Sequence, residues 1–253
     1  DSIVFNGAFN AGEPAPLLLE KDPPEYYDIT NVTIPGQFGY AVYAFRSPDN
    51  YQQTFYQETL DDARTMALNL KGSTAPVYSK IAVFDAGQEN YYVSQGLLIQ
   101  DAVDAATDGD IINVAAGNFA GAIINKDVTI QANPGETVII NDGPNTHTQF
   151  RAGFYFPDDY SGSGATVKGF RIEGFNQINK SLDDGKLDFG VFSRGANGVT
   201  VENNAITNML QAITNWHGSS WNVNHNDIEN LWTSNGGGIA ILVGASNGTT
   251  VTG

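Results

Sequence analysis

The chain has 253 residues and is 41% hydrophobic, which is enough for one elongated domain or two compact ones around a substantial core. A formal net charge of -16, with only 12 lysine and arginine residues, argues against a surface that neutralises the phosphates of nucleic acid or anionic lipid. The absence of cysteine excludes disulfides and thiolate metal sites, and no apolar stretch is long enough to cross a bilayer. We therefore expect no nucleic-acid partner, no membrane span, and a location outside the cell or at its surface.

The N-terminal third changes pattern once. Residues 1–37 are rich in proline and turn-forming residues and predict an irregular N-terminal arm. In residues 38–93, the stretches Tyr40–Phe45 and Val77–Phe84 have the β-branched and aromatic content of strands. Between them, Thr59–Leu70 carries apolar residues at helical spacing, and its first residue is a candidate N-cap. These patterns predict a small α/β segment over residues 38–93.

An amphipathic run, Leu98–Ala106, opens the next segment and places its apolar residues on one side of a predicted helix. It is followed at once by Gly109–Phe119, which reads Gly-Asp-x-Ile-x-Val-x-x-Gly-x-Phe. This pair of motifs is similar to the opening of many proteins in the pectate-lyase-like superfamily of right-handed parallel β-helices. The resemblance implies that the helix caps the first coil, whose apolar edge would otherwise invite aggregation.

The second half of the chain repeats itself. Val201–Met209 aligns with Val223–Leu231. A less similar copy spans Val167–Phe175, and a fourth copy begins at Val251. The short apolar runs are separated by asparagine and glycine, which tolerate the left-handed backbone that a sharp corner needs. We expect valine to stack on valine and isoleucine on isoleucine in the interior, with asparagine above asparagine at a corner.

These repeats also resemble those of the pectate-lyase-like superfamily. The fold class that we predict is mainly β: a right-handed parallel β-helix, or solenoid, over residues 94–253, with an N-terminal capping helix and a small α/β segment before it. The last residues, 248–253, begin a coil and stop. We therefore expect the β-helix to be C-terminally incomplete, and its end to be continued by further chain or covered through self-assembly.

Two long excursions interrupt the strands, at residues 143–153 and 176–190. Insertions in a solenoid crowd one face, which is often the binding face. The resemblance implies that lyases of this fold hold Ca²⁺ with carboxylates and use an arginine or lysine as base, whereas hydrolases use paired carboxylates. The candidate catalytic residues are Asp183, Asp184, Asp188 and Arg194. The three aspartates are also the candidate Ca²⁺ ligands, and a solvated loop is the alternative interpretation.

Aromatic residues near the middle coils predict a second kind of site. Exposed rings beside polar side chains suit carbohydrate, because a ring stacks on a sugar face while polar groups bind its hydroxyls. A place in the core is the alternative for each ring. The candidate ligand-binding residues are Trp216, His217, Trp221 and Trp232, with Phe189, Phe192 and Tyr160 nearby. The histidines, His147, His217 and His225, are too scattered in the sequence to predict a metal site.

Two functions follow from these patterns. The first is a non-catalytic extracellular β-helix scaffold of a cell-surface assembly, such as a surface layer, sheath, fibre or adhesin, with polysaccharide or Ca²⁺ as its candidate ligand and no other cofactor. The alternative is a polysaccharide lyase or glycoside hydrolase that acts on an extracellular polysaccharide. The paired-aspartate motif of pectin hydrolases and the Trp-Ile-Asp-His motif of pectate lyases are both missing from the sequence, which favours the first.

Overall fold

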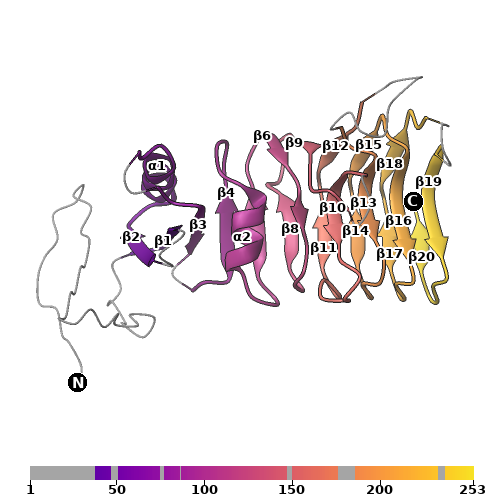
Figure 1. Ribbon diagram of the computed structural model, residues 1–253, viewed down its shortest axis with the longest axis horizontal. Coiled ribbons are helices and arrows are strands. Elements are labelled where there is room, and N and C mark those ends of the chain that lie inside the picture. The colour runs from indigo at the N-terminus through magenta and orange to yellow at the C-terminus, as the bar shows by residue number, and fades with distance from the viewer. Residues whose placement is uncertain are drawn as a thin grey trace, which may run out of the picture.

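The computed structural model describes residues 38–46, 51–74, 77–85, 87–146, 150–175, 186–232 and 237–253. These ranges contain two helices and twenty strands, which pair into one ten-stranded and two five-stranded sheets. Figure 1 shows the strands stacked one behind another along the long axis of the molecule. The chain is therefore mainly β.

Each sheet is a series of strands that lie far apart in the sequence. Sheet A has the order β2-β1-β3-β4-β5-β8-β11-β14-β17-β20. Its strands are β1 (Tyr40–Arg46), β2 (Tyr51–Gln57), β3 (Lys80–Asp85), β4 (Asn90–Val93), β5 (Ile111–Val114), β8 (Thr129–Ala132), β11 (Thr166–Lys168), β14 (Thr200–Glu202), β17 (Asn222–Asn224) and β20 (Thr250–Thr252).

Sheets B and C are built from the strands that follow each of the later sheet A strands. Sheet B contains β6 (Gly117–Ala120), β9 (Val138–Asp142), β12 (Arg171–Glu173), β15 (Ala205–Thr207) and β18 (Asp227–Glu229). Sheet C contains β7 (Ala122–Ile123), β10 (Ala152–Phe156), β13 (Phe189–Ser193), β16 (Gln211–Trp216) and β19 (Ile239–Gly244).

From β5 onward the chain visits sheets A, B and C in turn, and each strand pairs in parallel with the strand three elements later. We call each such set of three strands a unit. The registers confirm the alignment of the repeats. Val201 lies opposite Val167 and Val223, and Val223 lies opposite Val251. Ile206 lies between Ile172 and Ile228 in the same way.

The core runs through the inside of the stacked units. Alternate residues of sheets A and B point inward, and Val167, Val201, Ile172 and Ile206 are all fully buried. Large aromatic side chains fill the remaining space, as where the rings of Phe154 and Phe170 lie 5.2 Å apart. Burial of each such side chain contributes about 1.5–3 kcal/mol to folding, so the repeated apolar positions are the main source of stability.

Asparagines occupy the corner between sheets A and B, as predicted. Asn204 is 1% exposed, and its Nδ2 donates to Asn226 Oδ1 at 3.0 Å and to the Val167 carbonyl at 3.2 Å. Its Oδ1 accepts from the Phe170 N–H at 3.0 Å. The side chain of Asn204 therefore links three successive units. At the opposite end of the sheet B strands, Asn208 and Asn230 occupy equivalent positions with φ of 61° and 55°, in the left-handed region.

The N-terminal part packs one helix on antiparallel strands. Strand β1 pairs with β2 and with β3 in antiparallel registers, and helix α1 (Leu60–Lys71) contacts all three. Thr59 is the N-cap, because its Oγ1 accepts from the Asp62 N–H at 3.1 Å. The predicted helix is thus confirmed. Neither of the two helices in the described part of the chain is long and apolar enough to cross a membrane.

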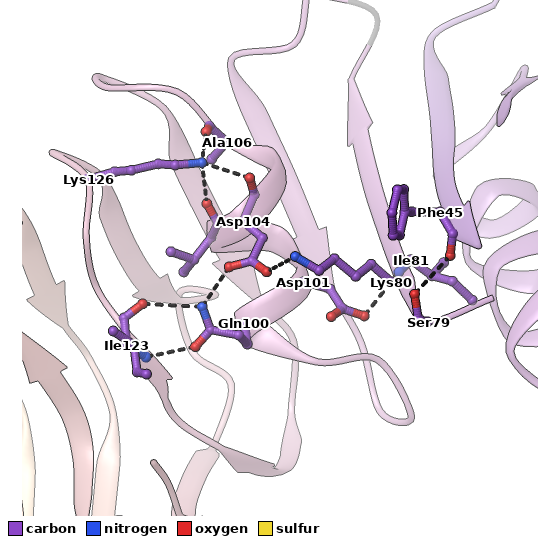
Figure 2. Close-up of polar contacts among 11 residues, drawn as sticks. Phe45, Ser79, Lys80, Ile81, Gln100, Asp101, Asp104, Ala106, Ile123 and Lys126 are labelled. Atoms are coloured by element: carbon purple, nitrogen blue, oxygen red, sulfur yellow. Dashed lines mark hydrogen bonds and ion pairs between the residues drawn. The ribbon is translucent and has the colours of Figure 1, made fainter. Parts of the chain in front are cut away.

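Helix α2 (Ile99–Ala105) contacts both the antiparallel strands and the parallel units (Figure 2). The Gln100 side chain accepts from the Ile123 N–H at 2.8 Å and donates to the Ile123 carbonyl at 3.3 Å, as a neighbouring strand would do at the edge of β7. The adjacent Asp101 accepts from the Ile81 N–H of β3 at 3.0 Å. One turn later Asp104 pairs with Lys80 at 2.5 Å. Two consecutive residues of one short helix thus bind the backbone of β7 in sheet C and of β3 in sheet A.

The C-terminal end of α2 is held by a single lysine. Lys126 Nζ donates to the carbonyls of Val103, Asp104 and Ala106 at 2.9, 2.7 and 2.5 Å, and these carbonyls belong to the helix turn that lacks internal partners. Burial lowers the pKa of the Lys126 amine from its ordinary value. The helix is therefore fastened at its end by a residue of the following unit.

The expected role of this helix as an N-terminal cap is not supported. Sheet A does not end at α2, because β5 pairs in parallel with β4 over four residues and β4 continues into β3. The helix lies beside a sheet that continues past it. The amphipathic pattern of the sequence predicts α2 correctly. It does not show that strands of sheet A come before this helix in the chain.

Asp101 gives a pH-dependent test of the junction. Burial raises the pKa of Asp101, so the folded protein keeps this proton to higher pH than the unfolded chain does. The stability that protonated Asp101 contributes is fully present below the pKa of this residue in the unfolded chain. It is lost as the pH rises through the pKa of Asp101 in the folded protein. Asp101→Asn keeps an oxygen acceptor for Ile81 and does not titrate, so its stability relative to wild type should rise as the pH increases above about 4, the pKa of an unperturbed aspartate.

Urea unfolding at several pH values measures this difference. Asp101→Ala also removes the acceptor, so it should be less stable than Asp101→Asn by about 1–2 kcal/mol at every pH. A flat profile for Asp101→Asn would contradict the assignment.

Candidate binding pocket on sheet C

Sheet C differs from the other two sheets because two of its strands, β10 and β13, are buried on both faces. Every residue of β10 and β13 is buried, whereas the short strands of sheets A and B alternate between buried and more exposed positions. Since successive residues of a strand point to opposite faces, both faces of β10 and β13 are covered. A second hydrophobic cluster, apart from the core, lies here: Ala152, Tyr155, Phe189, Phe192, Leu210 and Trp232.

Three of the longer connections in the repeated part lead from sheet B to sheet C. They join β9 to β10, β12 to β13 and β18 to β19, and the first two contain the predicted excursions. The connection from β15 to β16 is short by comparison, because only residues 208–210 separate the two strands. The two predicted excursions therefore both lead into sheet C.

A pocket of about 360 Å³ opens over β13 and β16. Both strands contribute side chains, and so do the residues that follow each of them. The lining consists of Phe150, Phe189, Phe192, Arg194, Gln211, Trp216 and His217. Four aromatic rings thus surround three polar side chains.

Packed phenylalanines line the inner part of the pocket. The rings of Phe189 and Phe192 lie 4.7 Å apart with their planes tilted by 35°, and Phe150 meets Phe189 edge to face at 5.4 Å. Phe189 and Phe192 are nearly buried, at 4% and 6% exposure. Such contacts hold the rings in place.

Trp216 and His217 form the outer rim. Trp216 is 40% exposed, and its ring lies 6.2 Å from the His217 ring. Trp216 is the last residue of β16 and pairs with Gly244, the last residue of β19. The His217 N–H donates to the Gly244 carbonyl at 2.8 Å, so both rim residues are fixed to the next unit.

The turn after Trp216 is held from beneath by Asn215, which is 1% exposed. Its Oδ1 accepts from the Gly218 N–H at 3.0 Å, and its Nδ2 donates to the Gly218 carbonyl at 3.0 Å. The same Nδ2 lies 3.4 Å from Ser246 Oγ and from Thr249 Oγ1 of the next unit. This turn places His217 in the left-handed region, with φ of 64°. The rim is therefore preorganised by buried hydrogen bonds.

The polar groups of the pocket suit binding better than hydrolysis. Among the described residues that line it, Arg194 is the one permanently charged side chain and none is a carboxylate. Glycoside hydrolysis needs an acid and a second carboxylate on either side of the bond that breaks. An arginine, an amide and an imidazole can instead form hydrogen bonds to hydroxyl or acidic groups of a bound molecule.

The structure divides the predicted site residues. It brings Trp216, His217 and Arg194 together in the pocket. Trp221 lies in the core at 1% exposure, where its Nε1 donates to the Ala196 carbonyl at 2.7 Å and its ring lies 5.9 Å from that of Phe156. Trp232 is buried in the cluster on sheet C.

The predicted acidic cluster is represented by Asp188 alone, because Asp183 and Asp184 lie outside the described residues. Asp188 is fully buried, and its Oδ2 accepts from the Arg151 N–H at 2.9 Å. Its backbone carbonyl accepts from the N–H groups of Leu210 and Gln211 at 3.0 and 3.1 Å. These contacts join three successive units.

The described ranges contain no group of three His, Asp or Glu side chains that is placed to hold a metal ion. Of the other histidines, His225 is exposed after β17, with its Nδ1 3.1 Å from Asn224 Oδ1, and His147 lies outside these ranges.

Sequence reasoning missed Phe150, Gln211 and Gly244. Gln211 lies opposite Phe189 in the sheet, but this pairing cannot be read from the repeats, because the connections before sheet C vary in length. A glycine opposite an exposed tryptophan would have been a usable signal only if the register of β16 and β19 had been known.

No protein-family model, no curated protein and no solved structure matches this chain.

Proposed function

We propose that this protein is a non-catalytic carbohydrate-binding module in an extracellular, cell-surface scaffold. The observation that carries the proposal is the pocket on sheet C, in which a fixed, partly exposed Trp216 stands beside Arg194 and His217. A flat sugar face would stack on the indole ring while these side chains and Gln211 bind hydroxyl or acidic groups.

The scaffold part of the proposal rests on the repeated units. We propose that they form a right-handed parallel β-helix of the pectate-lyase-like type, supported by the A, B, C order of the strands and by the stacked Val, Ile and Asn positions. The net charge of -16 suits a solvated surface outside the cell.

A polysaccharide lyase is the second candidate, and one observation favours it. Arg194, the residue that a lyase of this type would use as its base, lines the same pocket. Such an enzyme would also need carboxylates to hold Ca²⁺ against an acidic sugar. Its product would carry an unsaturated sugar end, which a binding module does not generate.

Binding and turnover can be measured on one panel of acidic and neutral oligosaccharides. We expect the wild type to bind a member of the panel without releasing unsaturated or reducing ends. Trp216→Ala should weaken that binding about tenfold or more, since it removes the stacking surface. His217→Ala should weaken it as well.

His225→Ala is the matched control, because His225 is also an exposed histidine with positive φ but lies outside the pocket lining. Its binding should equal that of the wild type. If the wild type shows turnover and Arg194→Ala does not, the protein is a lyase and not a non-catalytic binding module. Absence of binding across the whole panel would overturn the carbohydrate proposal.

A further inference from the structure

We propose that Gly244 is a positioning residue for the pocket: by lacking a side chain, it lets the Trp216 ring lie on the backbone of the next unit and fixes the ring as a binding platform. This inference rests on the proposed function for its ligand. The packing on which it depends can be tested without any ligand.

The register brings the two residues together. Trp216 and Gly244 are Cα partners at the ends of β16 and β19. A β-carbon on Gly244 would collide with Cε3 and Cζ3 of the indole and would lie 3.0 Å from Cη2. The ring therefore occupies the volume in which any other residue would carry its side chain.

The backbone of Gly244 does not itself require glycine. Its φ is not in the left-handed region, whereas Gly248, four residues later, has φ of +70°. The space around Gly248 would accept a β-carbon, because the nearest atom would be Ser220 Oγ at 3.6 Å. Gly244 is thus required by the space that Trp216 fills, and Gly248 by its own backbone.

The contact has a consequence for binding. Gly244 holds Trp216 on one side, and the Gly244 carbonyl accepts from the N–H of His217. The indole is 40% exposed and lines the pocket, so the part of its surface that does not rest on Gly244 is available to a ligand. A platform held in this way loses little conformational freedom when it binds, which favours affinity.

A double-mutant cycle on the same oligosaccharide panel tests the inference. Gly244→Ala should weaken binding about tenfold, as loss of the fixed ring does in Trp216→Ala. In the Trp216→Ala background the added Gly244→Ala should cause no further loss, because the volume it needs is empty. Gly248→Ala is the control, and it should lower the unfolding midpoint through its strained backbone while leaving binding unchanged.

Acrylamide quenching of tryptophan fluorescence supplies the ligand-free readout. Trp221 and Trp232 are 1% and 7% exposed, so quenching reports mainly on Trp216. Gly244→Ala should increase quenching and Gly248→Ala should not. If the wild type binds no sugar, the proposed function fails, while a quenching change would still support the packing role of Gly244. Quenching and affinity that both equal those of the wild type in Gly244→Ala would overturn the inference.

Discussion

Replacing Trp221 by alanine should lower the free energy of unfolding by about 4 kcal/mol, the loss typical of a large aromatic side chain removed from a core. Trp221 is 1% exposed and packs edge to face on Phe156. Its truncation would also remove the donor to the buried Ala196 carbonyl, which is costly to leave unpaired.

Urea unfolding followed by circular dichroism measures this loss, and Trp216→Ala is its matched partner. Trp216 is largely outside the core, so its truncation should cost less than about 1 kcal/mol while it weakens sugar binding. Trp221→Phe keeps an apolar ring and serves if the alanine variant does not fold. A Trp221 variant that keeps full stability but loses sugar binding would reverse the assignment of the two tryptophans.

Replacing Asn204 by alanine should cost about 3 kcal/mol, although the change removes little apolar surface. The Phe170 N–H and the Val167 carbonyl would lose the side-chain partner that Asn204 provides, and Asn226 Oδ1 would keep only the backbone N–H of residue 204, at 3.1 Å. Asn204→Asp keeps the shape but presents a carboxylate oxygen to Asn226 Oδ1, so it should cost at least as much.

The control for this series is Asn222→Ala, since Asn222 is an exposed asparagine of the neighbouring β17. Its unfolding midpoint should stay close to that of the wild type. Hydrogen exchange adds a spatial readout, because units contact mainly their neighbours. Protection should fall most in β11, β14 and β17. Equal midpoints for the Asn204 and Asn222 variants would show that the corner amides contribute little.

The sequence predicts sheets A and B better than sheet C, and the reason is physical. The strands around Val201 and Ile206 have one buried face, so their alternation and their repeats are visible. The Phe189–Ser193 strand is buried on both faces and has no alternation to detect. The pocket lies on this sheet, so its lining could be predicted only in part.

The N-terminal part shows the same limit. The helix between Thr59 and Leu70 and the strand from Tyr40 follow from local patterns, and the structure contains both. Strand β2 was not predicted, because its glutamines have low apolar character and its pairing with β1 is what makes it a strand. Trp216 is exposed and Trp221 is buried because of the corner between them, whose geometry is set by Asn215. The pattern of apolar residues does not reveal this geometry.

The Gln100 amide has a consequence for association between molecules. A sheet with apolar side chains on both faces would be an aggregation hazard if the backbone of its edge strand were open to another chain. At Ile123, both backbone groups that face α2 are taken by Gln100, so an incoming strand would have to displace an intramolecular pair. A strand could therefore pair with β7 at Ile123 only after both hydrogen bonds to the Gln100 side chain had broken.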